Sequence, residues 1–132
     1  MTVIDASALV EVLLNRSPGE RLAHRLRDPG ETLHAPHLID LEVAQALRRY
    51  EATGEMSPDR SRQALLVFVQ MPIERHAHWP LLERVWELRR NITAYDAAYI
   101  ALAEALDAPL LTCDRALASA PGHRAVVELY GG

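Results

Sequence analysis

The chain has 132 residues, which suits one domain (1–132) with a core that needs no disulfide or metal to hold it together. A net charge of −4 argues against a protein that coats nucleic acid nonspecifically, although local patches could still bind phosphate. The one cysteine excludes an internal disulfide and a cysteine-cluster metal site. No signal peptide or long apolar span is visible, which predicts a cytoplasmic protein that does not enter a membrane.

Short apolar runs alternate with helical patterns along the chain. The predicted strands are, in order, 2–4, 32–35, 71–74, 110–112 and 125–128. The predicted helices are 8–14, 17–27, 37–52, 60–69, 79–90, 93–106 and 115–118. The end of helix 60–69 is apolar nearly all round, so we expect it to be buried on two sides. Strands that alternate with helices throughout predict a parallel α/β sandwich.

The helix 93–106 and the strand after it form the best-defined unit of the chain. Thr93 is a good N-cap, and Asp96 stands three residues later, where the acid of a capping box would be. The start of such a helix lies at the same edge of a parallel sheet as the carboxyl ends of the strands. Asp96 is therefore expected to face Asp114, which follows the strand.

Four carboxylates occupy equivalent places in this topology, each just after a strand or in the first turn of the helix that follows one. They are Asp5, Glu42, Asp96 and Asp114. Each alone fits an acid that favours a helix start, but four at one sheet edge would repel one another unless cations were bound. Carboxylate oxygens suit Mg²⁺ or Mn²⁺, which can activate a water and neutralise a phosphoryl group.

Four segments resemble the signature blocks of PIN-domain ribonucleases, specifically VapC-type toxins of type II toxin–antitoxin modules. They are VIDASAL (3–9), LIDLEV (38–43), TAYDAAYIALA (93–103) and LTCDRAL (111–117). The blocks stand in the family's order and span nearly the whole chain. The resemblance implies a PIN-like three-layer α/β/α sandwich with a parallel five-stranded sheet in the order 3-2-1-4-5. It also implies endonucleolytic cleavage of RNA that depends on Mg²⁺, with Mn²⁺ as a substitute.

The resemblance also assigns residues and partners. It implies that the metal-binding and catalytic acids are Asp5, Glu42, Asp96 and Asp114, with the hydroxyls of Ser7 and Thr112 supporting the site. The implied partners are the RNA substrate, a second copy of the chain in a homodimer, and a cognate VapB-type antitoxin whose C-terminal segment occupies and inhibits the site.

Two other functions fit the same residues. One is a different metal-dependent phosphohydrolase, such as a DNA nuclease or a phosphatase. The other is a binding module whose acidic cleft receives a basic peptide. The residues leave open whether one or two ions bind, which RNA is cut, and whether Arg89 or Arg115 contacts it.

Several conspicuous side chains are expected to have ordinary roles. His76 and His78 could be metal ligands on one strand face, but no acid or third histidine stands at a compatible spacing, so we expect them to face solvent or form local hydrogen bonds. The other histidines are expected to be structural. Trp79 and Trp86, seven residues apart on one predicted helix, are expected to pack, and Cys113 to fill a small space in the core.

Overall fold

The structure is a computed structural model that describes residues 1–131, so the last residue of the predicted 1–132 domain lies outside the described residues. The strands are β1 (Thr2–Ile4), β2 (Leu33–Pro36), β3 (Ile73–His76), β4 (Leu110–Thr112) and β5 (Val127–Leu129). The helices are α1 (Ala6–Leu14), α2 (Ser17–Arg25), α3 (Ile39–Ala52), α4 (Pro58–Gln70), the short 3-10 helix η1 (Trp79–Leu81), α5 (Leu82–Glu87), α6 (Ala94–Leu106) and α7 (Arg115–Ala118).

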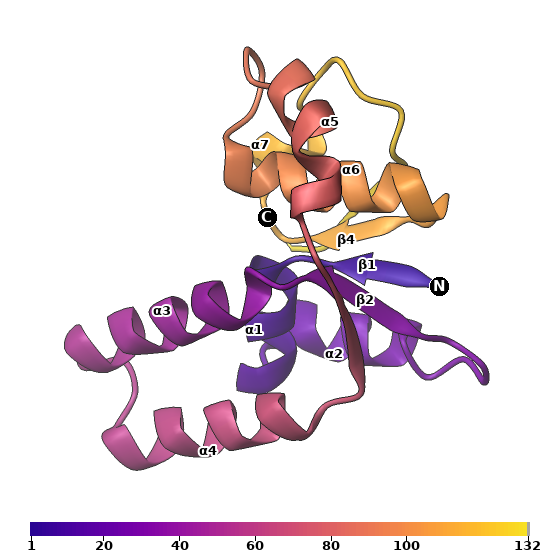
Figure 1. The fold of residues 1–132 in the computed structure, drawn as a ribbon. Helices are drawn as coiled ribbons and strands as arrows, with labels where there is room; N and C mark the ends of the chain where they lie inside the picture. The colour runs from indigo at the N-terminus through magenta and orange to yellow at the C-terminus, as the bar shows by residue number, and fades with distance from the viewer. Residues whose placement is uncertain (132) are drawn as a thin grey trace.

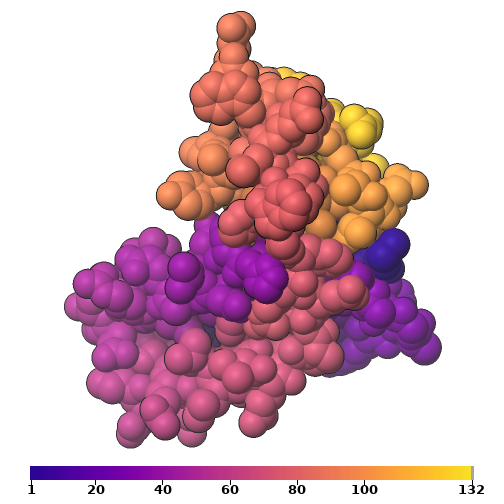
Figure 2. All heavy atoms as spheres, in the orientation of Figure 1, coloured from indigo at the N-terminus to yellow at the C-terminus, as the bar shows by residue number. Residues whose placement is uncertain are grey.

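The five strands form one parallel sheet in the order β3-β2-β1-β4-β5, which confirms the predicted sandwich and strand order. In Figure 1, helices α1 to α4 lie below the sheet and α5 to α7 above it. The space-filling view in Figure 2 shows the molecule narrowing between these two groups. Among residues 1–131, no helix combines the length and the apolar character needed to cross a bilayer.

The middle of the sheet is built from the two most apolar strands, β1 and β4. Val3 pairs with Leu110 and Ile4 with Leu111, and all four side chains are fully buried. Parallel strands that are covered on both faces have continuous apolar sequences, which is why these two short strands could be predicted from the sequence. Their pairing places the residues that follow Ile4 beside those that follow Leu111, at the carboxyl edge of the sheet.

Helix α6 covers this central pair closely because much of its surface is alanine. Its residues 97–103 are all buried between the sheet and α5. Thr93 is the N-cap and accepts a hydrogen bond from the Asp96 amide at 3.2 Å, as the sequence predicted. The cap fixes the start of α6 above the carboxyl ends of the strands, which places Asp96 at that edge of the sheet.

Some predicted boundaries are wrong. The third strand is Ile73–His76, two residues later than predicted, because it pairs in register with β2 from Leu33 onward. The predicted helix 79–90 consists of η1 and the short helix α5, and Glu87 is its last helical residue. Strands β1 and β4 and helix α7 have the predicted bounds, and the remaining elements differ from the predicted ones by one or two residues at their ends.

The prediction that helix 60–69 is buried on two sides is wrong. Helix α4 packs mainly against α3 and α1, with Ala64 and Phe68 turned inward. Leu66, Val67 and Val69 remain 48%, 55% and 63% exposed. An apolar sequence without a polar face gives no information about which side a neighbour covers, so this exposed surface could not be predicted.

The prediction that the two tryptophans pack is also wrong. Trp79 is 72% exposed and Trp86 is 66% exposed. Trp79 begins the 3-10 helix η1 and Trp86 lies near the end of α5, so the change of helix type removes the single α-helical face on which their seven-residue spacing would have aligned them. Trp86 instead carries the Arg89 guanidinium 4.6 Å from its ring centroid.

Candidate active site

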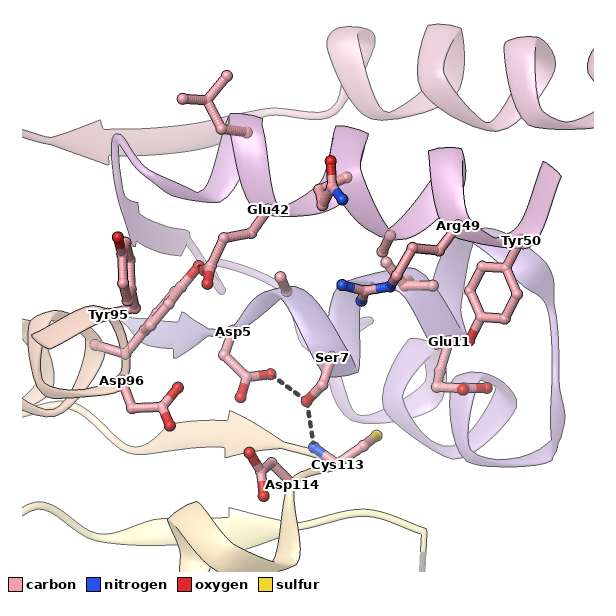
Figure 3. Close-up of a pocket in the computed structure, with 16 residues that line it drawn as sticks. Asp5, Ser7, Glu11, Glu42, Arg49, Tyr50, Tyr95, Asp96, Cys113 and Asp114 are labelled. Atoms are coloured by element: carbon pink, nitrogen blue, oxygen red, sulfur yellow. Dashed lines mark hydrogen bonds between the residues drawn. The ribbon is translucent and has the colours of Figure 1, made fainter. Parts of the chain in front are cut away.

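The four predicted acids meet in one cavity at the carboxyl edge of the sheet. The cavity has a volume of about 670 Å³ and contains Asp5, Glu42, Asp96 and Asp114 in its wall. Figure 3 shows these carboxylates approaching one space from different elements. Asp5 follows β1, Glu42 lies in the first turn of α3, Asp96 in the first turn of α6, and Asp114 follows β4. The predicted convergence is confirmed.

Asp5 is the most buried of the four and is held at both carboxylate oxygens. Its Oδ1 accepts hydrogen bonds from the Ala8 amide at 2.9 Å and the Ser7 hydroxyl at 2.7 Å. Its Oδ2 accepts a hydrogen bond from the Thr112 hydroxyl. The Ser7 and Thr112 oxygens in turn accept the amides of Cys113 at 3.0 Å and Asp114 at 2.9 Å. The two predicted supporting hydroxyls therefore tie β1 to β4 through Asp5.

Glu42 is positioned by a residue that the sequence analysis did not assign. The Tyr99 hydroxyl donates to Glu42 Oε1 at 2.6 Å, and the ring of Tyr99 is buried in α6. Tyr99 stands three residues after Asp96, on the same face of α6. That spacing from an acid was the signal that could have identified it.

Asp114 and Asp96 lie opposite each other, as predicted. Asp114 is the N-cap of α7, and its Oδ1 accepts the amides of Ala116 at 2.9 Å and Leu117 at 3.2 Å. The negative charge of Asp114 contributes to the raised pKa of Asp96, after the larger effect of burial. The two acids are thus close enough to repel each other.

The cavity carries an excess of negative charge. Among the ion pairs found over residues 1–131, none includes any of the four carboxylates. Burial raises the pKa of Asp5 and of Glu42, and in both cases the charge of Asp96 adds to the rise while hydrogen bonds oppose it. Bringing a hard cation into the cavity would relieve this cost.

The residues present fit a divalent ion of the Mg²⁺ class. All four candidate ligands offer carboxylate oxygens, the donors that such ions prefer, and they come from four elements that surround one space. Asp5 and Glu42 are already held in place by hydrogen bonds before an ion binds. A site whose ligands are held in this way needs little rearrangement to accept the ion.

Other side chains in the cavity wall were not assigned from the sequence. Arg49 of α3 stands seven residues, or two turns, after Glu42, and Figure 3 shows its guanidinium reaching into the cavity. Tyr95, beside Asp96, is 66% exposed at the rim. Cys113 is half-buried between the cavity wall and the hydrophobic core, against which it packs, and burial raises its pKa to about 11. Its thiol is therefore protonated at neutral pH and is a poor nucleophile.

A shallower depression adjoins the acidic cavity. Asp96 belongs to the walls of both, and the second depression also includes Arg89, Arg90 and Thr93. The two hollows together form a surface with acids at its centre, Arg49 toward one end and an arginine pair toward the other. A phosphodiester chain laid along it would meet guanidinium groups on both sides of the acids.

Comparison with known proteins agrees with this arrangement. The family model described as PIN domain matches residues 2–122. Ribonuclease VapC12 of Mycobacterium tuberculosis is 42% identical over 129 residues, which cover 98% of both chains, and ribonuclease VapC1 of the same species is 42% identical over 128 residues, which cover 96% of both. The crystal structure of VapBC2 from Rickettsia felis bound to a promoter DNA fragment has a chain with a TM-score of 0.72 and 14% identity, covering 98% of both chains. The chain therefore belongs to the PIN-domain family and to its VapC-type branch, in which the two relatives above are named ribonucleases.

Proposed function

We propose that this protein is a metal-dependent endoribonuclease that acts as the toxin of a toxin–antitoxin pair. The observation that carries the proposal is the convergence of four carboxylates without a cationic partner among the described residues, in a chain of the VapC type. We further propose that residues 1–132 form a single PIN domain that cleaves RNA in the cytoplasm, since the family match spans residues 2–122 and one sheet organises the fold.

In this proposal Asp5, Glu42, Asp96 and Asp114 are the metal-binding and catalytic acids, with Ser7 and Thr112 in support. Mg²⁺ is the proposed cofactor, with Mn²⁺ as a substitute, and when bound it supplies a more acidic water and positive charge for the phosphoryl oxygens. Ser7 and Thr112 keep Asp5 in one orientation, and Tyr99 does the same for Glu42. The carboxylates would orient the attacking water in line with the scissile bond.

Inhibition by a small antitoxin follows from the same charge. A basic side chain placed among the four acids would form the ion pairs that these acids lack within residues 1–131, and it would exclude the metal ion. The exposed apolar side chains of α3 and α4, Leu41 and 65–67 among them, give the antitoxin or a second copy of the chain a surface to cover. The proposed assembly is a homodimer that binds its antitoxin.

The test is cleavage of total cellular RNA by the purified, antitoxin-free protein with Mg²⁺, with Mn²⁺ and with EDTA. We expect cutting at few sites with either ion and none with EDTA, and no cutting by Asp5→Ala. Parallel incubations with single-stranded DNA, duplex DNA and a phosphatase substrate test the other phosphohydrolases. Cleavage of DNA alone would replace the proposal by a DNA nuclease. A folded, antitoxin-free protein that cuts nothing would favour a module that only binds basic peptides.

Replacing Arg49 by glutamine is expected to weaken binding of RNA more than the chemical step. The guanidinium of Arg49 enters the cavity from α3 and is placed to contact a backbone phosphate beside the scissile one. Loss of one phosphate contact should raise KM by about tenfold, leave kcat nearly unchanged and reduce the slope of log KM against log salt by about one. Arg48→Gln is the matched control, because Arg48 lies in a different depression, between α3 and α4. Equal effects of the two substitutions would contradict the assignment.

A further inference from the structure

A second group of potential metal ligands lies on the sheet, away from the acidic cavity. His34 of β2 pairs with Glu74 of β3, and His76 follows two residues later on the same strand. Because side chains alternate between the faces of a sheet, the three lie on one face. Arg75, between the last two, points to the opposite face and packs against α3 and α4. None of the three ligands lines the acidic cavity.

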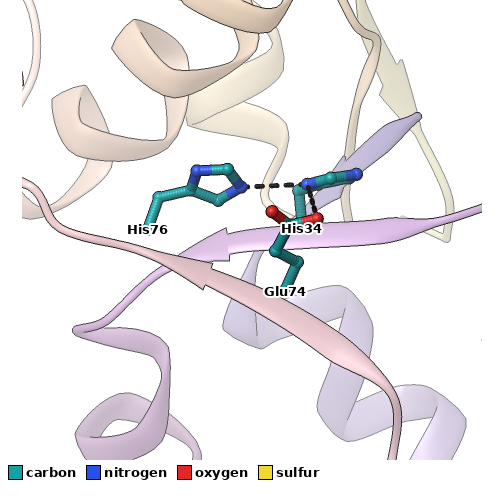
Figure 4. Close-up of side chains that lie close together, drawn as sticks. All are labelled: His34, Glu74 and His76. Atoms are coloured by element: carbon teal, nitrogen blue, oxygen red, sulfur yellow. Dashed lines mark hydrogen bonds and ion pairs between the residues drawn. The ribbon is translucent and has the colours of Figure 1, made fainter.

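The three side chains direct their ligand atoms at one another. His34 Nδ1 lies 2.9 Å from His76 Nε2 and 3.6 Å from Glu74 Oε2. One ligand atom from each residue can be chosen so that all three lie within 4.8 Å of one another. Figure 4 shows the two rings meeting edge to edge on one side of β2 and β3, with the glutamate beside His34. This overturns the expectation that His76 has no acid or third histidine nearby.

His34 is prepared to act as a ligand. Its ring is buried, and its Nε2 lies 2.8 Å from the Thr32 hydroxyl. When Nε2–H donates to that hydroxyl, the lone pair of Nδ1 points toward His76 and Glu74, which is the arrangement found around metal-binding histidines. Burial lowers the pKa of His34, and this outweighs the opposing effect of Glu74.

Two imidazoles and one carboxylate are a donor set that suits a borderline ion such as Zn²⁺ better than Mg²⁺. We propose that His34, Glu74 and His76 bind one Zn²⁺ ion, with a fourth position left to water. Nitrogens bound to one tetrahedral Zn²⁺ lie about 3.3 Å apart, given Zn–N bonds of about 2.0–2.1 Å. The two nitrogens lie 2.9 Å apart without the ion and need to separate by only a few tenths of an ångström. The ion then takes the place of the hydrogen bond between the two rings.

A Zn²⁺ ion bound at this site would link β2 and β3 at the edge of the sheet. Strand β3 lies at one edge of the sheet and pairs only with β2 within residues 1–131. A bound ion adds a link between the two strands that the backbone ladder does not supply. The native state is then stabilised by the free energy of binding, so the melting temperature rises with the Zn²⁺ concentration.

The experiment is calorimetric titration of the full chain with ZnCl₂ in excess MgCl₂, which competes for the acidic cavity. We expect a single ion per chain and a rise in melting temperature. Binding should be lost in His76→Ala and weakened by about tenfold or more in Glu74→Gln and Thr32→Val. Zn²⁺ binding should be unchanged in Asp96→Asn, which tests whether the ion binds in the acidic cavity instead. It should also be unchanged in His78→Ala, which removes an exposed histidine two residues from the proposed site.

The choice of variants distinguishes the loss of a metal ligand from the unfolding of the protein. Glu74 is largely exposed, so Glu74→Gln should melt like the wild type when no metal is present, and its weaker binding reports on ligation alone. Co²⁺ provides a second readout, because its visible absorption reports the imidazole ligands. Absence of Zn²⁺ binding, loss of it in Asp96→Asn, or its survival in His76→Ala would overturn the proposal and leave the pair His34–His76 as a hydrogen bond.

Discussion

Replacement of Asp96 by asparagine is expected to abolish Mg²⁺-dependent cleavage of RNA while the fold stays intact. Asparagine has nearly the same shape, but it removes one of the four charges that surround the proposed ion. Loss of about 4 kcal/mol of stabilisation of the transition state corresponds to a rate about 10³-fold lower. The measurement is the single-turnover rate on an RNA that the wild type cuts, at saturating Mg²⁺.

Asp107→Asn is the matched control for this substitution. Asp107 is the C-cap at the opposite end of the same helix, exposed and in the left-handed conformation with φ of 50°. Asparagine tolerates that conformation well, so the same change of side chain is made on α6 without touching the cavity. Asp107→Asn should cut RNA at the wild-type rate. Near wild-type cutting by Asp96→Asn would show that the acidic cavity is not the active site.

Asp96→Asn should also make the metal-free protein more stable. Burial and the charge of Asp114 raise the pKa of Asp96, so its ionised form is disfavoured in the folded state at neutral pH. A neutral asparagine removes that cost, and the melting temperature in EDTA should rise. Mg²⁺ should raise the melting temperature of the wild type and have a smaller effect on the variant. A variant that melts earlier in EDTA would mean that Asp96 has a structural role instead.

The parts of the fold that could be predicted are those with local signals. Thr93 and Asp96 mark the start of α6, and the apolar runs of β1 and β4 mark the centre of the sheet. Strands that alternate with helices form a parallel sheet, in which all carboxyl ends of the strands lie at one edge, so the four acids could be grouped before the structure was known. The family resemblance supplied the strand order itself.

The parts that were missed depend on contacts between distant segments. The group His34, Glu74 and His76 forms only because two strands pair in one register, and the two histidines are 42 residues apart in sequence. Tyr99 and Arg49 carry helical spacings from Asp96 and Glu42, but a spacing does not say which face meets the cavity. The exposed face of α4 was missed for the same reason, since residues 64–69 at its end are apolar nearly all round.

Replacement of Arg84 by methionine is expected to reduce the free energy of unfolding by about 2–3 kcal/mol. The Arg84 guanidinium donates to both carboxylate oxygens of Glu104, at 2.7 and 3.0 Å, and so joins α5 to α6. The Glu104 side chain is only 2% exposed, and removal of its partner leaves a buried charge. The expected loss lies below the 3–5 kcal/mol typical of fully buried pairs because Arg84 is 27% exposed. Urea unfolding at pH 7 measures it, with exposed Arg62→Met as the control.

The loss should depend on pH with a definite sign. The hydrogen bonds from Arg84 lower the pKa of Glu104 from its usual value of 4.5, so the pair stabilises the fold above that value and loses its effect as the pH falls through the lower, folded-state pKa. The difference between the wild type and Arg84→Met should therefore be largest near neutral pH and shrink in acid. Arg84→Lys keeps the charge without the two-pronged geometry and should lose an intermediate amount. A difference that stays constant down to pH 3 would mean that packing of the long side chain, and not the ion pair, holds α5 against α6.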